Sequence, residues 1–388
     1  MAIERIYLDW NATAPLMAAA RDAMLDALAM PGNPSSVHAE GRAARAVIEK
    51  ARRAVATLVG AEAAHVTFTA SATEAANQVL SPVYRMGKSR VGLGRLYVSA
   101  IEHPAVRAGG RFPKELVTEL AVTPAGLIDL DALTSTLAGH DASEGLPVVA
   151  VMLVNNETGI IQPIREVSAI VKKLGGLLVV DAVQAAGRIP LSIADVGADF
   201  MILSAHKLGG PKGVGALVSK GETFMPEPLV RGGGQEKGHR AGTENLPAIA
   251  GFGAAAERMS ADLLNRNAGI AALRDRAEAG MLSTAPETVI YGRSEARVGN
   301  TSFFHLPGLK AETGQIAFDL EGLALSAGAA CSSGKVGASH VLTAMGEDAA
   351  TGALRLSIGP DTTESDIDRF LGAFVKIAAR RKPAGQAA

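Results

Sequence analysis

Segments typical of β-strands alternate with segments typical of α-helices from about residue 60 to residue 220. The strand-like segments are short and apolar, and they span residues 65–70, 95–100, 147–154, 176–180, 200–203 and 213–219. This alternation predicts crossover units and a mostly parallel sheet covered by helices. In such a sheet a ligand lies at the carboxyl ends of the strands.

Five polar side chains follow these strands at their carboxyl ends: Thr73, His103, Asn156, Asp181 and Lys207. Taken singly, each has an ordinary explanation. The residues around Thr73 form a capping box, Ser71 with Glu74, although a helix N-terminus can also hold a phosphate. A lone histidine is often only a loop residue, and a buried aspartate often serves in an ion pair or cap. Because all five meet at one edge of the predicted sheet, a single site explains them together.

Lys207 is the most informative of the five. It directly follows the buried strand 200–203 and is flanked by Ser204, His206 and the pair Gly209-Gly210. Most lysines lie on solvated helix faces, whereas this one is presented on a glycine-rich turn. Burial readily lowers the pKa of a lysine amine, which suits it to form a Schiff base with an aldehyde cofactor.

Length and composition restrict the remaining possibilities. The chain has 388 residues, 48% hydrophobic and 20% charged, which predicts a soluble globular protein with more than one domain. Its formal net charge of -1 disfavours a nucleic-acid partner. No apolar run reaches the roughly 18–20 residues that span a membrane, and the N-terminus lacks the pattern of a signal peptide. We therefore expect a cytoplasmic protein with no membrane or nucleic-acid partner.

The chain has one cysteine, Cys331. A single cysteine excludes an intramolecular disulfide framework and a multi-cysteine metal site, and it agrees with a reducing compartment. It also makes Cys331 the only thiol for sulfur chemistry. Its surroundings, residues 327–334, are small and flexible, and a loop of this kind can swing between a cofactor and an external acceptor. The ordinary alternative is a buried small hydrophobic residue.

The pattern changes in the last third of the chain. Residues 231–247 form a glycine-rich polar loop that leads through Pro247 into a long alanine-rich helix. From about Asn265 a helix, short strands and a further helix follow, which predicts a smaller α+β domain.

Many motifs along the chain resemble those of the NifS/IscS-like cysteine desulfurases, in the order in which that family has them. They are YLDWNATAP (7–15), GNPSSVH (32–38), FTASATEAAN (68–77), IEHPAV (101–106), VNNETGIIQPI (154–164), VDAVQAAGRIP (180–190), LSAHKLGGPKGVGAL (203–217), GGGQEKGHRAGTEN (232–245), NTSFFHLPG (300–308), AGAACSSGK (327–335), SHVLTAMG (339–346) and LRLSIG (354–359).

The resemblance implies an α/β fold of the pyridoxal 5′-phosphate (PLP) fold type I, also called class V aminotransferase-like. Its large domain has a mixed, mostly parallel seven-stranded sheet between helices, and its smaller domain is α+β. Residues 14–262 are expected to form the large PLP-binding domain. Residues 1–13 and 263–388 are expected to form the small domain, which carries Cys331.

The resemblance also implies roles for the residues of the cofactor site. Lys207 is expected to form the Schiff base and carry a proton to the substrate α-carbon, and His103 to stack on the cofactor ring with acid–base duties. Asp181 is expected to pair with the pyridinium nitrogen and Gln184 to contact the phenolic oxygen. The cofactor phosphate is expected to be held by Ala72, Thr73, Ser204, His206 and, from a neighbouring subunit, Thr243, which implies a homodimer.

Substrate and sulfur chemistry follow from the same resemblance. Asn156, which also adjoins the cofactor, and Arg355 are expected to bind the substrate carboxylate, for which the arginine fork is suited. Cys331 is expected to take sulfur from L-cysteine and become a persulfide, then pass it to a protein acceptor such as an iron–sulfur scaffold. A free thiol titrates at about 8.5, so its deprotonation needs help from His103 or the bound cofactor.

Two alternatives stay open from the sequence. One is a related fold-type I enzyme, such as a selenocysteine lyase or an aminotransferase. The other is a non-catalytic scaffold of the same fold that binds iron–sulfur assembly proteins. The presence of Lys207, His103, Asp181 and Cys331 favours an enzyme.

Overall fold

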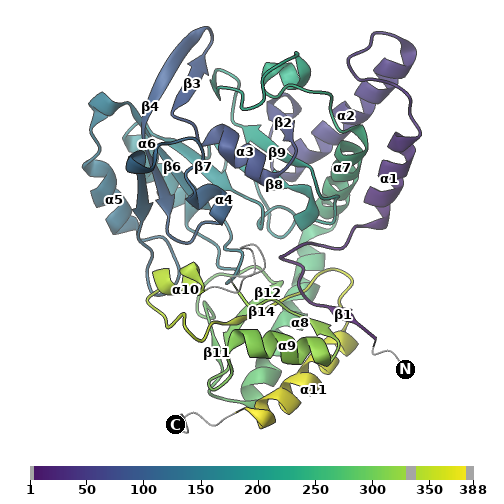
Figure 1. Ribbon diagram of the computed structural model, residues 1–388, viewed down its shortest axis with the longest axis vertical. Helices are drawn as coiled ribbons and strands as arrows, with labels where there is room; N and C mark the ends of the chain where they lie inside the picture. Colours follow the sequence, from purple (N-terminus) through teal and green to yellow (C-terminus); the bar gives the residue numbers. More distant parts are fainter. Residues whose placement is uncertain (1–3, 329–337, 382–388) are drawn as a thin grey trace.

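The computed structural model describes residues 4–328 and 338–381 of the chain. A larger lobe is built around a wide sheet, and a smaller lobe holds both ends of the described chain (Figure 1). The strands are β1 (Ile6–Tyr7), β2 (Val66–Thr69), β3 (Val83–Met86), β4 (Ser89–Ser99), β5 (Val117–Leu120), β6 (Leu146–Met152), β7 (Leu177–Asp181), β8 (Phe200–Ser204), β9 (Gly215–Ser219), β10 (Phe224–Pro226), β11 (Val289–Ile290), β12 (Thr301–His305), β13 (Leu323–Ala324) and β14 (Leu354–Ser357).

The helices are distributed over both lobes. They are α1 (Ala18–Leu28), α2 (Ala39–Leu58), α3 (Ala72–Val79), α4 (Pro104–Arg107), α5 (Leu130–Ala138), α6 (Ile164–Lys173), α7 (Leu246–Ser260), α8 (Leu263–Thr284), α9 (Ala311–Leu320), α10 (His340–Ala344) and α11 (Glu364–Arg380). The predicted alternation of strands and helices is confirmed from β2 to β7, apart from the β3–β4 hairpin, whereas no α-helix separates β7 from β8 or β8 from β9.

The large sheet has a body of seven strands in the order β5-β4-β6-β7-β8-β9-β2, and its pairings are mostly parallel, as expected. The strands β3 and β10 extend it to nine, which corrects the expected number of seven. The reason is the length of β4. It begins at Ser89, before the expected Arg95, and its first half pairs with β3 across the turn at Gly87, whose φ is +60°.

Strand direction explains why the predicted site residues meet. Strands β4, β6, β7 and β8 are parallel to one another. Strand β9 is antiparallel to β8, and β2 is antiparallel to β9, so β2 again runs in the direction of β8. The carboxyl ends of β2, β4, β6, β7 and β8 therefore lie at one edge of the sheet.

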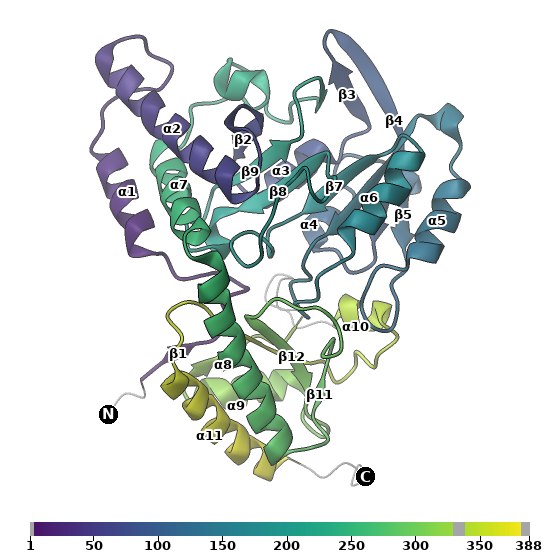
Figure 2. The same cartoon turned by 180° about the vertical axis from the view of Figure 1, so that it is seen from behind.

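Alternate residues of the strands face two different layers of helices. Val149 and Val151 of β6 belong to the core beneath α1, α2, α5, α6 and α7. Val148 and Ala150 of the same strand pack with α3 and α4 on the opposite face. Figure 2 shows α2, α6 and α7 on the face turned to the viewer. The sheet is thus buried on both sides, which explains its continuous apolar strands.

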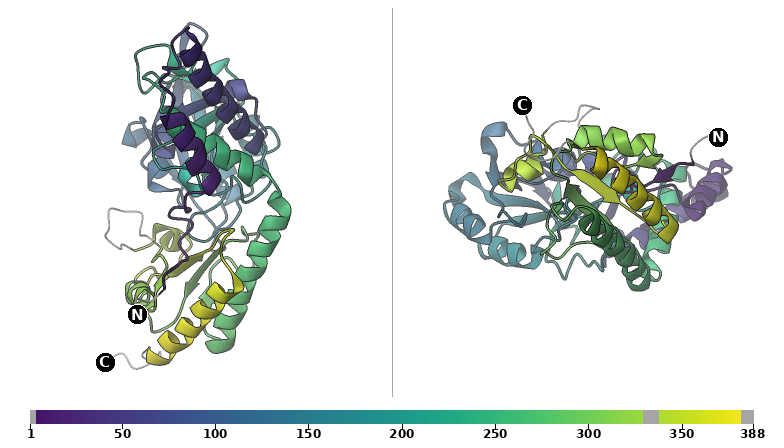
Figure 3. Two further views of the ribbon diagram at one scale, coloured as in Figure 1. Left: turned by 90° about the vertical axis from the view of Figure 1, so that its right-hand side faces the viewer. Right: turned by 90° about the horizontal axis from the view of Figure 1, so that it is seen from below.

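The smaller lobe has its own core. Strands β11, β12 and β14 form an antiparallel sheet, and β1 pairs with β13. Helices α8 and α11 pack together along this lobe (Figure 3). The core includes a group of phenylalanines from strand and helix: Phe304, Phe318, Phe370 and Phe374.

Two features bear on the proposed division between domains. The N-terminal residues Ile6 and Leu8 belong to the core of the smaller lobe. Helices α7 and α8 are separated by a kink at Asp262, whose φ is +51°. The proposed boundaries at residues 13 and 262 stay a prediction. No helix in the described part of the chain is long and apolar enough to cross a membrane.

Candidate active site

A cavity of about 370 Å³ opens at the carboxyl ends of the strands of the large sheet. It brings together most of the residues predicted from the sequence: Ala72, Thr73, His103, Asn156, Asp181, Gln184, Ser204, His206, Lys207 and Arg355. They come from both lobes, because Arg355 belongs to β14 of the smaller lobe.

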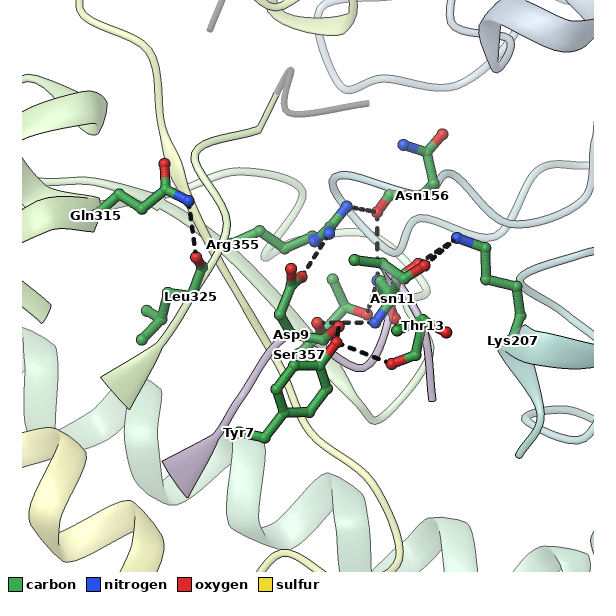
Figure 4. A network of polar contacts seen from close by, with 12 residues as sticks. Tyr7, Asp9, Asn11, Thr13, Asn156, Lys207, Gln315, Leu325, Arg355 and Ser357 are labelled. Carbon is green, nitrogen blue, oxygen red and sulfur yellow. Dashed lines mark hydrogen bonds and ion pairs between the residues drawn. The ribbon is translucent and has the colours of Figure 1, made fainter. Parts of the chain in front are cut away.

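Lys207 ends a short 3-10 turn, Ala205–Lys207, that follows β8 directly. Its Nζ donates hydrogen bonds of 2.8 Å to the backbone carbonyls of Asn11 and Ala12 (Figure 4). The turn continues through Gly209, whose φ is +87°, and a Cβ at this position would lie 2.6 Å from Met17. The glycine is thus required both by the backbone conformation and by the close contact.

Asp181 ends β7 and lies beside Lys207 in the cavity. Its Oδ1 accepts a hydrogen bond of 2.9 Å from the backbone nitrogen of Val183. Burial raises the pKa of Asp181 to about 6, and the Val183 hydrogen bond and the charge of Lys207 only partly oppose this effect. A cationic group bound next to this carboxylate would favour its charged form and so offset the free energy that its burial costs.

Gln184 lies one turn further along the chain. Its Nε2 donates to the carbonyl oxygen of Asn11 at 3.1 Å, and its Oε1 accepts a hydrogen bond from Arg188 Nη1. An arginine side chain has hydrogen-bond donors only, so the Gln184 atom that faces Arg188 must be the amide oxygen. The NH2 group of Gln184 therefore points away from Arg188. Arg188 Nη2 also donates to the carbonyl of Lys207 at 3.4 Å.

His103 is the residue that caps α4, and its Nδ1 accepts a hydrogen bond of 3.1 Å from the backbone nitrogen of Ala105. This contact places the proton of the neutral ring on Nε2. Burial lowers the pKa of His103 to about 4, and the charges of Lys207 and His340 add to this lowering. The imidazole is therefore neutral at pH 7.

The depressed pKa of His103 predicts acid sensitivity of the cofactor-free protein. A group whose pKa is lower in the folded state favours folding above its unfolded pKa, here about 6.5, and loses this contribution as the pH falls toward 4. We expect the midpoint temperature of unfolding of His103→Gln, relative to that of wild type, to rise as the pH is lowered from 6.5 to 4. The comparison of the two proteins isolates His103 from Asp181, whose raised pKa acts in the opposite direction in both. Differential scanning calorimetry checks this, and an equal slope in both proteins contradicts it. His65→Gln is the control, because His65 lies in a 3-10 turn (Ala63–His65) that has no buried residue and is outside the cavity.

Small residues and a helix N-terminus form one end of the cavity. Ser71 caps α3, with its Oγ accepting from the backbone nitrogen of Glu74 at 3.0 Å. Half of the predicted capping box is thus confirmed, because Glu74 Oε2 accepts from the backbone nitrogen of Ala70, at 2.9 Å, rather than from that of Ser71. His206 also lines the cavity, and its Nδ1 lies 3.1 Å from Thr13 Oγ1. Burial, with help from Lys207 and other nearby cations, lowers the pKa of His206 to about 4. The free backbone N–H groups of the helix suit an anion such as a phosphate.

Arg355 is fully buried at the other end of the cavity, 1% exposed. Its Nη1 donates to the carbonyl of Asn156 at 2.8 Å and its Nη2 to Asp9 Oδ1 at 2.7 Å (Figure 4). Within the described chain, Arg355 Nε and Asn156 Oδ1 are buried without a hydrogen-bond partner. Such atoms are costly unless a ligand satisfies them, and a carboxylate with an adjacent amino group fits both.

Two predicted residues are not brought to this cavity by the described chain. Thr243 is exposed and lines a separate hollow with Glu236 and Arg240. Its expected contact is with a neighbouring subunit, so that role stays a prediction. Cys331 lies outside the described residues.

The sequence did not single out Asn11, Ala12 or Arg188. No site role was assigned to the motif YLDWNATAP, yet the carbonyls of Asn11 and Ala12 accept hydrogen bonds from Lys207, and that of Asn11 also accepts one from Gln184. Every residue has a backbone carbonyl, so an acceptor of this kind cannot be recognised from the residue types of a sequence. The four-residue spacing between Gln184 and Arg188 was the one available signal, because it is the spacing of neighbours on a helical turn.

Comparisons with known proteins agree with this geometry. The family model described as aminotransferase class-V matches residues 6–370. A cysteine desulfurase from Cereibacter sphaeroides is 40% identical over 378 residues, which cover 95% of this chain and 94% of that protein.

Solved structures give the same result. The NifS-like protein from Rickettsia africae superposes with a TM-score of 0.86 at 34% identity, covering 97% of this chain and 100% of that one. A structure described as SspA in complex with cysteine has a TM-score of 0.74 at 26% identity, covering 92% and 99%.

The chain therefore belongs to the class-V aminotransferase family, whose members use PLP. Within that family it belongs to the NifS-like cysteine desulfurases. The resemblance and the fold type predicted from the sequence are confirmed.

Proposed function

We propose that this protein is a PLP-dependent cysteine desulfurase that converts L-cysteine to L-alanine and places the sulfur on Cys331 as a persulfide. The observation that carries the proposal is the convergence of Lys207, Asp181, His103 and Arg355 on one cavity. The C–S bond of the substrate breaks and an S–S bond to Cys331 forms. The substrate carbon is thereby reduced and the transferred sulfur is left at the oxidation level of a persulfide.

The residues present fit the cofactor. A helix N-terminus with Ala72 and Thr73, together with Ser204 and His206, suits its phosphate. Asp181 suits its ring nitrogen, and the NH2 group of Gln184 suits its phenolic oxygen. When bound, PLP supplies an electron sink that stabilises negative charge on the substrate α-carbon.

The remaining steps fall to the chain's own groups. Arg355 Nε and the amide nitrogen of Asn156 donate to the substrate carboxylate, and Asn156 Oδ1 accepts from the adjacent amino group, so both unpartnered atoms are satisfied. Lys207 Nζ, released from the carbonyls of Asn11 and Ala12, moves a proton at the α-carbon. The neutral His103 Nε2 exchanges a proton with the substrate or with the Cys331 thiol.

We further propose a homodimer in which Thr243 reaches the cofactor phosphate of the neighbouring subunit. Its exposed position away from its own cavity supports this role. The acceptor of the persulfide sulfur is proposed to be a protein of iron–sulfur cluster assembly, and the compartment a reducing cytoplasm.

Incubation with L-cysteine and a dithiol reductant, with alanine and sulfide quantified, tests the proposal. We expect equal amounts of the two products from wild type and a loss of both of at least about 10³-fold in Cys331→Ala, which lacks the nucleophile. The yellow absorption of bound cofactor should persist in the variant. Alanine formation by Cys331→Ala at the wild-type rate contradicts the proposed sulfur transfer and favours a lyase or aminotransferase. A purified wild-type protein that holds no PLP favours the scaffold.

A further inference from the structure

Arg188 contacts two residues of the candidate active site without lining the cavity itself. Its Nη1 donates to Gln184, both to the side-chain Oε1 and, at 3.2 Å, to the backbone carbonyl. Its Nη2 donates to the backbone carbonyl of Lys207 at 3.4 Å. Gln184 and Lys207 both line the cavity. The Arg188 guanidinium therefore supports these two residues from outside the space that a ligand occupies.

The backbone of Arg188 is held from two sides. Its nitrogen donates to the carbonyl of Ala185 at 3.0 Å, within the turn that follows β7, and Gly187 in this turn has a φ of +75°. From α8 of the smaller lobe, Arg266 Nη2 donates to the carbonyl of Gly187 at 3.1 Å and Asn267 Nδ2 donates to that of Arg188. The place of the guanidinium is thus determined by both lobes.

The charge of Arg188 acts on carbonyl oxygens. Burial lowers the pKa of Arg188 to about 9, and the charge of Arg355 adds to this lowering, so the guanidinium keeps its charge at pH 7. Its hydrogen bonds go to Gln184 and to the carbonyl of Lys207. A charged donor binds an oxygen more strongly than a neutral donor does, so the contact with the Gln184 amide resists exchange of its two ends.

The Gln184 amide has two orientations, which differ in the end that faces the cavity. Because an arginine side chain only donates, Arg188 permits just one of them, with Oε1 toward the guanidinium and Nε2 away from it. Nε2 donates one hydrogen to the carbonyl of Asn11 at 3.1 Å. Among residues 4–328 and 338–381 its second hydrogen has no acceptor, although Gln184 is only 5% exposed. A buried donor of this kind is costly unless a ligand accepts from it.

We propose that Arg188 is a positioning residue for the cofactor, which fixes the Gln184 amide so that its NH2 group faces the phenolic oxygen of bound PLP. This inference rests on the proposed function, because it takes PLP as the group in the cavity. A phenolate accepts a hydrogen bond from an NH2 group, whereas an amide oxygen in the same place repels it. The fixed amide therefore favours the ionised form of that oxygen.

The test uses the difference between side chains that only donate and side chains that also accept. Arg188→Lys keeps a side chain with donors only, and Arg188→Met removes every donor. Arg188→Gln introduces an amide that can meet either end of the Gln184 amide and so no longer fixes it. Each protein is loaded with PLP, and the affinity for PLP and the absorption of bound PLP as a function of pH are measured.

We expect the pH midpoint of the absorption change to rise by about one pH unit in Arg188→Met and Arg188→Gln, because the phenolate loses an oriented donor. The affinity for PLP should fall about fivefold in both, the usual effect of one lost hydrogen bond. Arg188→Lys should stay close to wild type in both measurements. Arg274→Met is the matched control, since Arg274 is also partly buried and donates to the carbonyl of Val298 at 3.1 Å, but lies outside the cavity.

A double-variant comparison shows whether Arg188 acts through Gln184. Gln184→Leu should raise the midpoint by a similar amount, and adding Arg188→Met to it should change nothing further. A shift from Arg188→Met that persists in the Gln184→Leu background marks a direct effect of the charge and overturns the inference.

An unchanged midpoint in Arg188→Met and Arg188→Gln also overturns the inference, and if Arg188→Met does not fold, Arg188→Gln takes its place in every comparison. An equal shift in Arg188→Lys and Arg188→Gln overturns it too, because the donor-only character of the side chain then has no effect. A wild-type protein that binds no PLP overturns the proposed function instead, so the two failures are distinguishable.

Discussion

Replacing Lys207 by alanine is expected to lower kcat for alanine formation by at least about 10³-fold. Lys207 lines the cavity, and the variant loses both a covalent attachment for the cofactor and a positioned proton donor, which alone contributes on the order of 10²–10⁴. Alanine formation from L-cysteine and the absorption spectrum of the protein after addition of PLP measure the two losses separately.

Two variants sharpen the Lys207 experiment. Lys207→Arg keeps the positive charge and its effect on Asp181 but supplies no amine for an aldehyde, so it should be as inactive as the alanine variant. Lys220→Ala is the matched control, because Lys220 also directly follows a strand of the same sheet, β9, but is exposed outside the cavity. A Lys207→Arg variant with more than about a tenth of wild-type activity contradicts the assigned role.

The sequence predicted the elements in which local pattern and burial agree. Residues 200–203 form β8 almost as expected, because an apolar run in a central strand is buried on both faces. The strand predicted at residues 176–180 is β7, from Leu177 to Asp181, and its apolar residues are likewise shared between the cores on the two faces of the sheet. In both cases the residues that form the element also determine its contacts.

The β3–β4 hairpin was missed because its pattern is weak. Residues 83–94 alternate polar, glycine and apolar residues, and β3 is exposed at its outer end. Its pairing comes from the hairpin turn and from β10, far along the chain, and neither leaves a local hydrophobic signal.

The residues of the candidate site also fall into those that the sequence could predict and those that it could not. Residues with distinctive chemistry at strand ends were found, since topology alone brings strand ends together. The acceptors of Lys207 were not found, because the carbonyls of Asn11 and Ala12 are 196 and 195 residues away and any residue could supply them.

Asp181→Asn is expected to lower kcat by about 10²–10³-fold, the usual effect of removing one preorganised electrostatic partner. The exchange is isosteric, and the new Oδ1 can still accept from Val183, so the fold and the local turn should persist. An amide cannot hold a protonated ring nitrogen as a carboxylate does. Activity assays with L-cysteine, together with the absorption spectrum of bound PLP, measure the loss. Asp199→Asn is the control, since the Asp199 carboxylate accepts a hydrogen bond from the backbone nitrogen of Leu178, at the opposite end of β7.

The same substitution should stabilise the cofactor-free protein above pH 6. Because burial raises the pKa of Asp181 from 3.8 to about 6, the folded state holds the proton more tightly than the unfolded state, and stability is lost as the pH rises through this window. Two pKa units correspond to roughly 3 kcal/mol, an upper limit for the gain in free energy of unfolding when the carboxylate is removed. Urea unfolding of both cofactor-free proteins at pH 8 and pH 4 measures it. If Asp181→Asn is less stable than wild type at pH 8, or if its free energy of unfolding changes equally at both pH values, the charged Asp181 does not destabilise the folded protein. A variant that is more stable and inactive shows that the site holds a desolvated charge for a cationic partner.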